Sequence, residues 1–189
     1  MLEKKIIGLT GPVASGKNTV AEILAQKGFY IIDVDQIGHR VLDIKKPEIV
    51  KAFGSQILDN QGQVDRRKLG QLVFEKKKHL NCLEKIVHPL IRKMVQEEIN
   101  SLQVNYIVVN AAILQKLGLL PLVNEVWVIL AKANLRLQRL QAKGLTLEEA
   151  RQRLKAQASI AGFRRIADKV ILNNRKIKDL EKKVNLCLG

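Results

Sequence analysis

The nine residues from position 11 to position 19 constrain the fold of this chain more than any other segment. They read GPVASGKNT, which fits the pattern GxxxxGK followed by a small polar residue. In this pattern backbone N–H groups surround an anion, the second glycine adopts a conformation closed to side chains, and the lysine reaches phosphate oxygens. We therefore predict a phosphate-binding loop (P-loop) that holds ATP. Its residues are Gly11, Pro12, Val13, Ala14, Ser15, Gly16, Lys17, Asn18 and Thr19.

The sequence around this loop predicts a parallel α/β fold. Residues 6–9 are a short apolar run typical of a buried strand, and the apolar spacing from Lys17 to a cap at Gly28 is typical of a helix. Residues 29–32 are strand-like again, so strand, glycine-rich turn, helix and strand follow in order. Further strand-like runs cover residues 106–109, 126–130 and 169–172. We expect an α/β fold with a five-stranded parallel sheet and helical insertions.

The stretch over residues 36–102 is mostly helical and basic in pattern. Pro47 can begin one helix, residues 60–62 mark a turn, and residues 83–99 have helical periodicity with Pro89 near the start. The stretch is too long for one crossover helix. We therefore expect a helical lobe here.

Capping and periodicity predict helices toward the C-terminus. Thr146 and Glu149 form a capping-box pattern that would open a helix over residues 147–158. A last amphipathic helix is expected over residues 176–188, and residues 114–122 form either a helix or a turn.

The charge of the chain favours anionic partners. Basic residues outnumber acidic ones by 33 to 18, a formal net charge of +15, which suits nucleic acid, an acidic membrane surface or a phosphorylated small molecule. Aromatic residues make up only 4%, which argues against a base-stacking platform. No apolar run approaches the ~20 residues that span a membrane. We expect small-molecule substrates, no nucleic acid and no membrane, with residues 76–78 on a solvated helix face.

Cysteine usage and the first residues favour the cytoplasm. Cys82 and Cys187 lie far apart without metal-type spacing, so we expect neither a disulfide framework nor a zinc site. The N-terminal residues lack the pattern of a secretory signal. We expect a cytoplasmic protein that is a monomer or a weak oligomer.

Two aspartates follow the second predicted strand. In an extended chain Asp33 and Asp35 project to the same side, at the carboxyl end of the strand where open parallel sheets bind ligands. One carboxylate could accept the proton of an acceptor hydroxyl while the other orients the substrate or a metal-bound water. Alternatively, the aspartates cap the next helix.

Asn18 bears on how the loop would hold a metal. It stands where a Ser or Thr hydroxyl usually binds Mg²⁺. An amide oxygen can also bind a hard cation, directly or through a water. We therefore expect ATP with Mg²⁺, and Asn18 as a candidate metal ligand. Ala14 stands where many such loops carry a third glycine.

Longer segments narrow the choice among P-loop proteins. The chain contains IIGLTGPVASGKNTVAEILAQKGFYIIDVDQIGHRVL, then VDRRKLGQLVF and HPLIR, and later RLQRLQAKGLTLEEARQRLKAQ and ADKVILNN. This combination resembles the dephospho-CoA kinase family nearly end to end. The resemblance implies one P-loop kinase domain over residues 1–189 with three α/β/α layers, a helical CoA lobe at about 36–102 and a lid at about 138–158. It also implies transfer of the γ-phosphate of ATP to the ribose 3′-hydroxyl of dephospho-CoA, the last step of coenzyme A synthesis.

The resemblance also implies roles for individual residues. Asp33 resembles the general base, His88 and Arg92 match a segment that holds the acceptor, and Arg139 and Lys143 resemble lid cations. Further substrate contacts are expected from Asn173 for ATP, and from Asp35 and His39 for the acceptor. Alternatively, these histidines, cations and asparagines are turn residues or solvated surface charges.

The chain departs from the family pattern at several positions. Asn110 and the following AAILQK replace a carboxylate, Pro-Leu-Leu and a Glu, while Lys143 replaces an arginine that could grip phosphate bidentately. Phe163 stands where a lysine is common. Three alternatives therefore stay open: a P-loop kinase of another nucleotide or small alcohol, a nucleotide-binding protein without catalysis, and a basic P-loop protein that binds nucleic acid.

Overall fold

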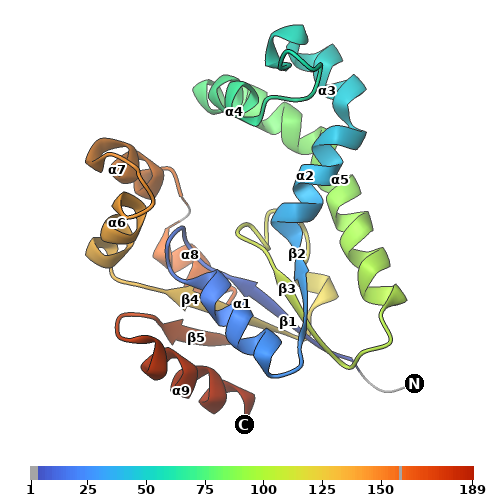
Figure 1. Cartoon of the computed structure of the whole chain (residues 1–189). Coiled ribbons are helices and arrows are strands. Elements are labelled where there is room, and N and C mark those ends of the chain that lie inside the picture. Colours follow the sequence, from blue (N-terminus) through green and yellow to red (C-terminus); the bar gives the residue numbers. More distant parts are fainter. Residues whose placement is uncertain (1–3, 158) are drawn as a thin grey trace. The chain divides into compact units, whose positions relative to one another are not determined.

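The computed structural model describes residues 4–157 and 159–189. Its chain forms two compact units (Figure 1). One combines the chain up to Asp33 with the segment from Leu102 to Gly189, and the other runs from Val34 to Ser101. The first unit is α/β and the second is helical.

The α/β unit is built on five parallel strands in the spatial order β2-β3-β1-β4-β5. The strands are β1 (Lys5–Thr10), β2 (Tyr30–Asp33), β3 (Tyr106–Asn110), β4 (Glu125–Leu130) and β5 (Lys169–Leu172). All five lie within a residue or so of the predicted runs, which confirms the parallel α/β fold. In the register of β2 and β3, Asp33 lies opposite Asn110, so the last residues of these two strands are neighbours.

Helices α1 (Lys17–Gln26) and α9 (Ile177–Leu188) pack on one face of this sheet. Alternate strand residues point into this layer, because side chains on a strand alternate between faces. Its fully buried members include Ile7, Leu9, Leu24, Trp127, Ile129 and Val184. Burial of each such side chain contributes about 1.5–3 kcal/mol, so this layer fixes the end of β1 against the start of α1. The opposite face receives Leu114 and Val123 against Gly8.

The other helical elements of this unit lie on either side of β4 in the chain. The 3₁₀ turn η2 (Leu120–Leu122) precedes β4, and α6 (Ala133–Gln141), α7 (Leu147–Lys155) and α8 (Ile160–Arg165) follow it. The capping box at Thr146 and Glu149 is confirmed, with reciprocal hydrogen bonds. The expected helix end at Ala158 lies outside the described residues, and α7 ends at Lys155. Residues 114–122 form turns and η2 instead of an α-helix.

The helical unit contains α2 (Val34–Ile44), α3 (Lys46–Phe53), the 3₁₀ turn η1 (Ser55–Ile57), α4 (Arg66–Glu75) and α5 (Lys77–Ser101). Pro47 lies in the first turn of α3, as predicted. The start predicted for the long helix is wrong, because α5 begins at Lys77 and carries Pro89 in its interior. Buried residues at four-residue spacing, from Val87 to Ile99, hold this helix against its neighbours, while Pro89 lies on the exposed side. Packing therefore outweighs the backbone hydrogen bond that the proline removes.

Candidate active site

The predicted P-loop connects the buried strand β1 to helix α1. Thr10 ends β1, α1 begins at Lys17, and Gly16 lies between them with φ +97°. A Cβ at Gly16 would overlap the side-chain nitrogen of Asn173. Both the backbone angle and the crowding therefore require glycine at this position.

Ala14 adopts a left-handed conformation with φ +58°, and it is the single non-glycine residue with positive φ in the described chain. An L-residue in this region costs about 1–2 kcal/mol. Replacing Ala14 by glycine is therefore expected to raise the free energy of unfolding by up to about 1 kcal/mol, after allowance for the more flexible unfolded chain. Urea unfolding measures this change. Ala142→Gly is the matched control, because Ala142 has an ordinary φ of −62°, and it should lower the free energy of unfolding. An equal decrease in both variants would show that the backbone of Ala14 is not strained.

Arg139 and Asn173, both predicted to contact ATP, lie against the back of the loop. Arg139 Nη1 donates to the carbonyl oxygens of Ala14 (3.0 Å) and Ser15 (3.2 Å), and Nη2 donates to that of Asn173 (3.1 Å). Asn173 is buried, and its Nδ2 also donates to the carbonyl oxygen of Ser15 (2.9 Å). These hydrogen bonds hold the loop against α6 and the residue that follows β5. A direct contact of Arg139 with phosphate stays a prediction, as does that of Lys143, which lies exposed beyond α6.

Two residues at the loop were not predicted. Arg136 is 6% exposed, and its Nε donates to the carbonyl oxygen of Val13 at 2.8 Å. Gln157 Oε1 accepts hydrogen bonds from Arg136 Nη2 and from the Val13 N–H, each at 2.8 Å. Burial lowers the pKa of the Arg136 guanidinium, because desolvation disfavours its charged form. Arg136 could have been found from its position one helical turn before Arg139, whereas Gln157 lies in an irregular segment without a sequence signal.

Lys17 lies in a cluster of amides at the start of α1. Its Nζ donates to Oδ1 of Asn110 and, at 3.4 Å, to Oδ1 of Asn18. Asn110 Nδ2 also contacts Asn18 Oδ1 at 3.5 Å. Asn110 is buried at the end of β3, opposite Asp33. The ammonium group of Lys17, two amide oxygens and one carboxylate thus come from the ends of three neighbouring elements.

This set could hold Mg²⁺ only together with a nucleotide. In the described part of the chain no group of three or more His, Cys, Asp or Glu residues could form a protein-only metal site. Mg²⁺ usually binds through one or two protein oxygens, several waters and the phosphates of its nucleotide. Asp33, Asn18 and Asn110 offer oxygens of this kind, so the residues fit a Mg–ATP complex.

The prediction that Asp33 and Asp35 project to the same side is wrong. Asp33 ends β2, but α2 begins at the next residue, so Asp35 lies in the first turn of a helix. The alternation that would place Asp33 and Asp35 on one side applies only to extended chain. A carboxylate in a first helical turn favours the helix through its dipole, which agrees with the alternative reading of Asp35.

The other predicted acceptor residues belong to the helical unit. His39 is half-buried in α2, and His88 and Arg92 lie four residues apart on α5, on the same side of the helix. His88 lines a cavity of about 330 Å³, together with Asn81, Glu84, Lys85 and Pro89. The side of α5 that carries His88 therefore presents a hollow. Contact of these residues with the acceptor stays a prediction.

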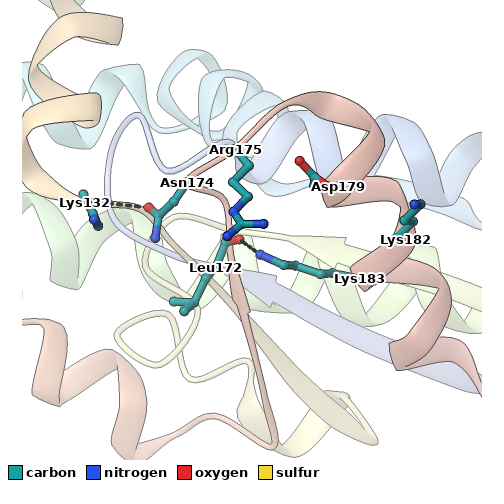
Figure 2. A pocket seen from close by; sticks show the side chains of 7 residues that line it. All are labelled: Lys132, Leu172, Asn174, Arg175, Asp179, Lys182 and Lys183. Carbon is teal, nitrogen blue, oxygen red and sulfur yellow. Dashed lines mark hydrogen bonds between the residues drawn. The ribbon is translucent and has the colours of Figure 1, made fainter.

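A larger basic cavity lies beside the ends of β4 and β5 (Figure 2). It measures about 600 Å³ and is lined by Lys132, Leu172, Asn174, Arg175, Asp179, Lys182 and Lys183. Asn174 Oδ1 accepts a hydrogen bond from the Lys132 N–H at 2.8 Å, and Lys183 Nζ donates to the carbonyl oxygen of Leu172 at 2.6 Å. Two of its lining residues, Leu172 and Asn174, are therefore the chain neighbours of Asn173, whose side chain contacts the P-loop. None of the helices in the described ranges is long and apolar enough to cross a membrane.

Comparison with known proteins gives one consistent result. A family model described as CoaE, dephospho-CoA kinase, matches residues 5–179. The dephospho-CoA kinase of Dehalococcoides mccartyi is 38% identical over 188 residues, which cover 96% of this chain and 95% of the relative. A crystal structure of a Thermus thermophilus protein matches with a TM-score of 0.87 at 31% identity, covering 98% of this chain and 97% of that one. The dephospho-CoA kinase of Campylobacter jejuni matches with a TM-score of 0.73 at 29% identity, over 98% and 96% of the two chains.

Proposed function

Because this chain belongs to the dephospho-CoA kinase family, and so phosphorylates dephospho-CoA with ATP in coenzyme A synthesis, we propose that Lys17 and Asp33 carry the transfer to the ribose 3′-hydroxyl. The observation that supports this is their placement: Lys17 contacts Asn110, and Asn110 lies opposite Asp33 in the sheet. A phosphate-binding cation at the amino end of α1 and a carboxylate at the carboxyl end of β2 are thus both next to the end of β3, at the edge where parallel sheets bind ligands.

Each group has a distinct task in this proposal. The P-loop amides and the dipole of α1 hold the β-phosphate, and the Lys17 ammonium neutralises charge on the β- and γ-oxygens. Asp33 accepts the proton of the 3′-hydroxyl while that oxygen bonds to the γ-phosphorus. The bond from the γ-phosphorus to the β–γ bridging oxygen breaks, and ADP leaves. Bound Mg²⁺ would neutralise phosphate charge.

The helical unit and the segment after β4 supply the remaining parts of the proposal. Acceptor contacts are assigned to Asp35, His39, His88 and Arg92. Residues 138–158, which carry Arg139 and Lys143, act as a lid within one kinase domain. The adenosine end of ATP lies at Asn173. The protein works in the cytoplasm as a monomer or weak oligomer, and it binds no nucleic acid.

A panel of acceptors tests the reaction and its specificity. Purified protein is incubated with Mg–ATP and dephospho-CoA, AMP or shikimate, and formation of CoA and ADP is measured. We expect stoichiometric CoA and ADP from dephospho-CoA and far slower turnover of the other acceptors. ADP formed with AMP or shikimate, without CoA from dephospho-CoA, would overturn the assignment. The panel also tests whether Asn110 and Lys143 have altered acceptor choice.

Replacing Asn18 tests its proposed role at the metal. Asn18→Ala is expected to raise the Mg²⁺ concentration needed for half-maximal rate by about tenfold, the size of effect typical of residues that orient a metal. Asn18→Thr should restore much of the loss, because a hydroxyl is an equally hard ligand. The rate is measured across a Mg²⁺ titration at constant ATP. A normal titration of Asn18→Ala would show that Asn18 does not hold the metal.

A further inference from the structure

Two arginines of α6 donate hydrogen bonds to three consecutive carbonyl oxygens of the P-loop. Arg136 Nε donates to the carbonyl of Val13 at 2.8 Å, and Arg139 Nη1 donates to those of Ala14 at 3.0 Å and Ser15 at 3.2 Å. We call this set of contacts the carbonyl clamp. It joins the loop to a helix that lies more than 120 residues away in the sequence.

The carbonyl clamp also fixes where the loop amides point. In a trans peptide the C=O and the N–H of one peptide group point in opposite directions, and the described chain has no cis peptide bond. The carbonyls of Val13 and Ser15 face α6, so the N–H groups of Ala14 and Gly16 face away from it. The Ser15 N–H closes a turn on the carbonyl oxygen of Pro12 at 3.1 Å. The loop therefore presents the two other amides on its side opposite α6.

Arg136 is a buried cation whose hydrogen-bond partners are neutral. The residue is 6% exposed, and its guanidinium donates to the carbonyl oxygen of Val13 and to Oε1 of Gln157. Burying a charge is costly, and neutral acceptors offset that cost only in part. An anion in the adjoining loop would supply the missing opposite charge. A hydrogen bond from a cation also polarises the peptide that accepts it, which strengthens the N–H of the same peptide as a donor.

We propose that Arg136 is a positioning residue for the β-phosphate of the nucleotide, acting through the Val13–Ala14 peptide. It orients and polarises this peptide so that the Ala14 N–H donates to the phosphate. Gln157 completes the arrangement, because its Oε1 accepts from both Arg136 and the Val13 N–H and so links the end of α7 to the loop. The proposal rests on the P-loop as the ATP site.

ADP distinguishes this role from that of a lid cation. A group that positions amides for the β-phosphate serves ATP and ADP equally, whereas a cation on the γ-phosphate serves ATP alone. Arg136→Gln is expected to weaken binding of both Mg–ATP and Mg–ADP by about tenfold, since hydrogen bonds to charged groups are among the stronger ones. The value of kcat at saturating substrates should change by less than about threefold. Arg136→Lys keeps the positive charge but lacks the planar guanidinium with its several N–H donors, so it should recover part of the affinity for both nucleotides.

Calorimetric titration of the full chain with each nucleotide, beside steady-state kinetics, measures these effects. Arg165→Gln removes the same charge from an exposed position of α8, outside the proposed lid, and should bind both nucleotides like the unmodified chain. Should Arg136→Gln not fold, Gln157→Ala keeps the arginine and should weaken both nucleotides in the same ratio. Affinity for ADP within twofold of normal in a folded variant, or a loss confined to ATP, would overturn the proposal. If the unmodified chain bound neither nucleotide, the ATP site itself would be refuted.

Discussion

Replacing Asp33 by asparagine is expected to lower kcat by about 10²–10⁴-fold, the usual contribution of a general base. The amide has nearly the same shape as the carboxylate but cannot accept the proton of the 3′-hydroxyl. Affinity for ATP should change little, because the contacts that hold the P-loop come from Arg136, Arg139 and Asn173. The measurement is kcat with saturating Mg–ATP and dephospho-CoA, together with calorimetric binding of ATP.

Two further variants make the Asp33 result specific. Asp43→Asn removes the same charge from an exposed position of α2 and should leave kcat unchanged. Asp35→Asn should have a smaller effect than Asp33→Asn, since Asp35 begins a helix rather than ending a strand. A large loss of kcat for Asp35→Asn with a normal rate for Asp33→Asn would transfer the role of base to Asp35.

Local patterns predicted the parts of this fold whose cause is local. The strand before residue 11, the helix beginning at Lys17 and the capping box at Thr146 depend on residues close in sequence, and each appears where it was expected. Helical periodicity predicted a start at residue 83, shortly before Pro89, whereas α5 begins at Lys77 and continues through the proline, with buried residues from Val87 to Ile99. Tertiary packing, which a single sequence does not display, outweighed the local rule.

The candidate site shows the same division. The P-loop lysine and Asp33 follow from motif and strand end, but the surroundings of Lys17 depend on strand register. In the sequence, Asn110 was identified only as the replacement of a carboxylate in the family pattern. The structure shows that its amide oxygen accepts a hydrogen bond from Lys17. Gln157 contacts the loop from 144 residues away, outside any regular element. Such contacts follow from the assembled sheet and cannot be derived from spacing alone.

Replacing Lys17 by methionine is expected to lower kcat/KM for ATP by about 10²–10³-fold, the loss typical of one group that stabilises charge in a transition state. Methionine keeps most of the apolar stem and removes the ammonium group. Part of the loss should appear in ATP affinity and part in kcat, because charge moves onto the β–γ bridging oxygen only during transfer. Steady-state kinetics with varied ATP, and calorimetric titration with ATP, separate the two parts.

The contacts of Lys17 decide which controls are informative. Lys27→Met removes an equal charge at the exposed end of α1 and should leave kcat/KM nearly unchanged. Asn110→Ala removes a hydrogen-bond acceptor of Lys17 but leaves the charge of the lysine in place. It should therefore lower kcat/KM for ATP far less than Lys17→Met does. The amides of Asn18 and Asn110 are neutral acceptors, and a charged phosphate oxygen forms a stronger hydrogen bond with an ammonium group than a neutral amide oxygen does. If Lys17→Met and Lys27→Met had equal, small effects, the ammonium of Lys17 would not take part in phosphate transfer.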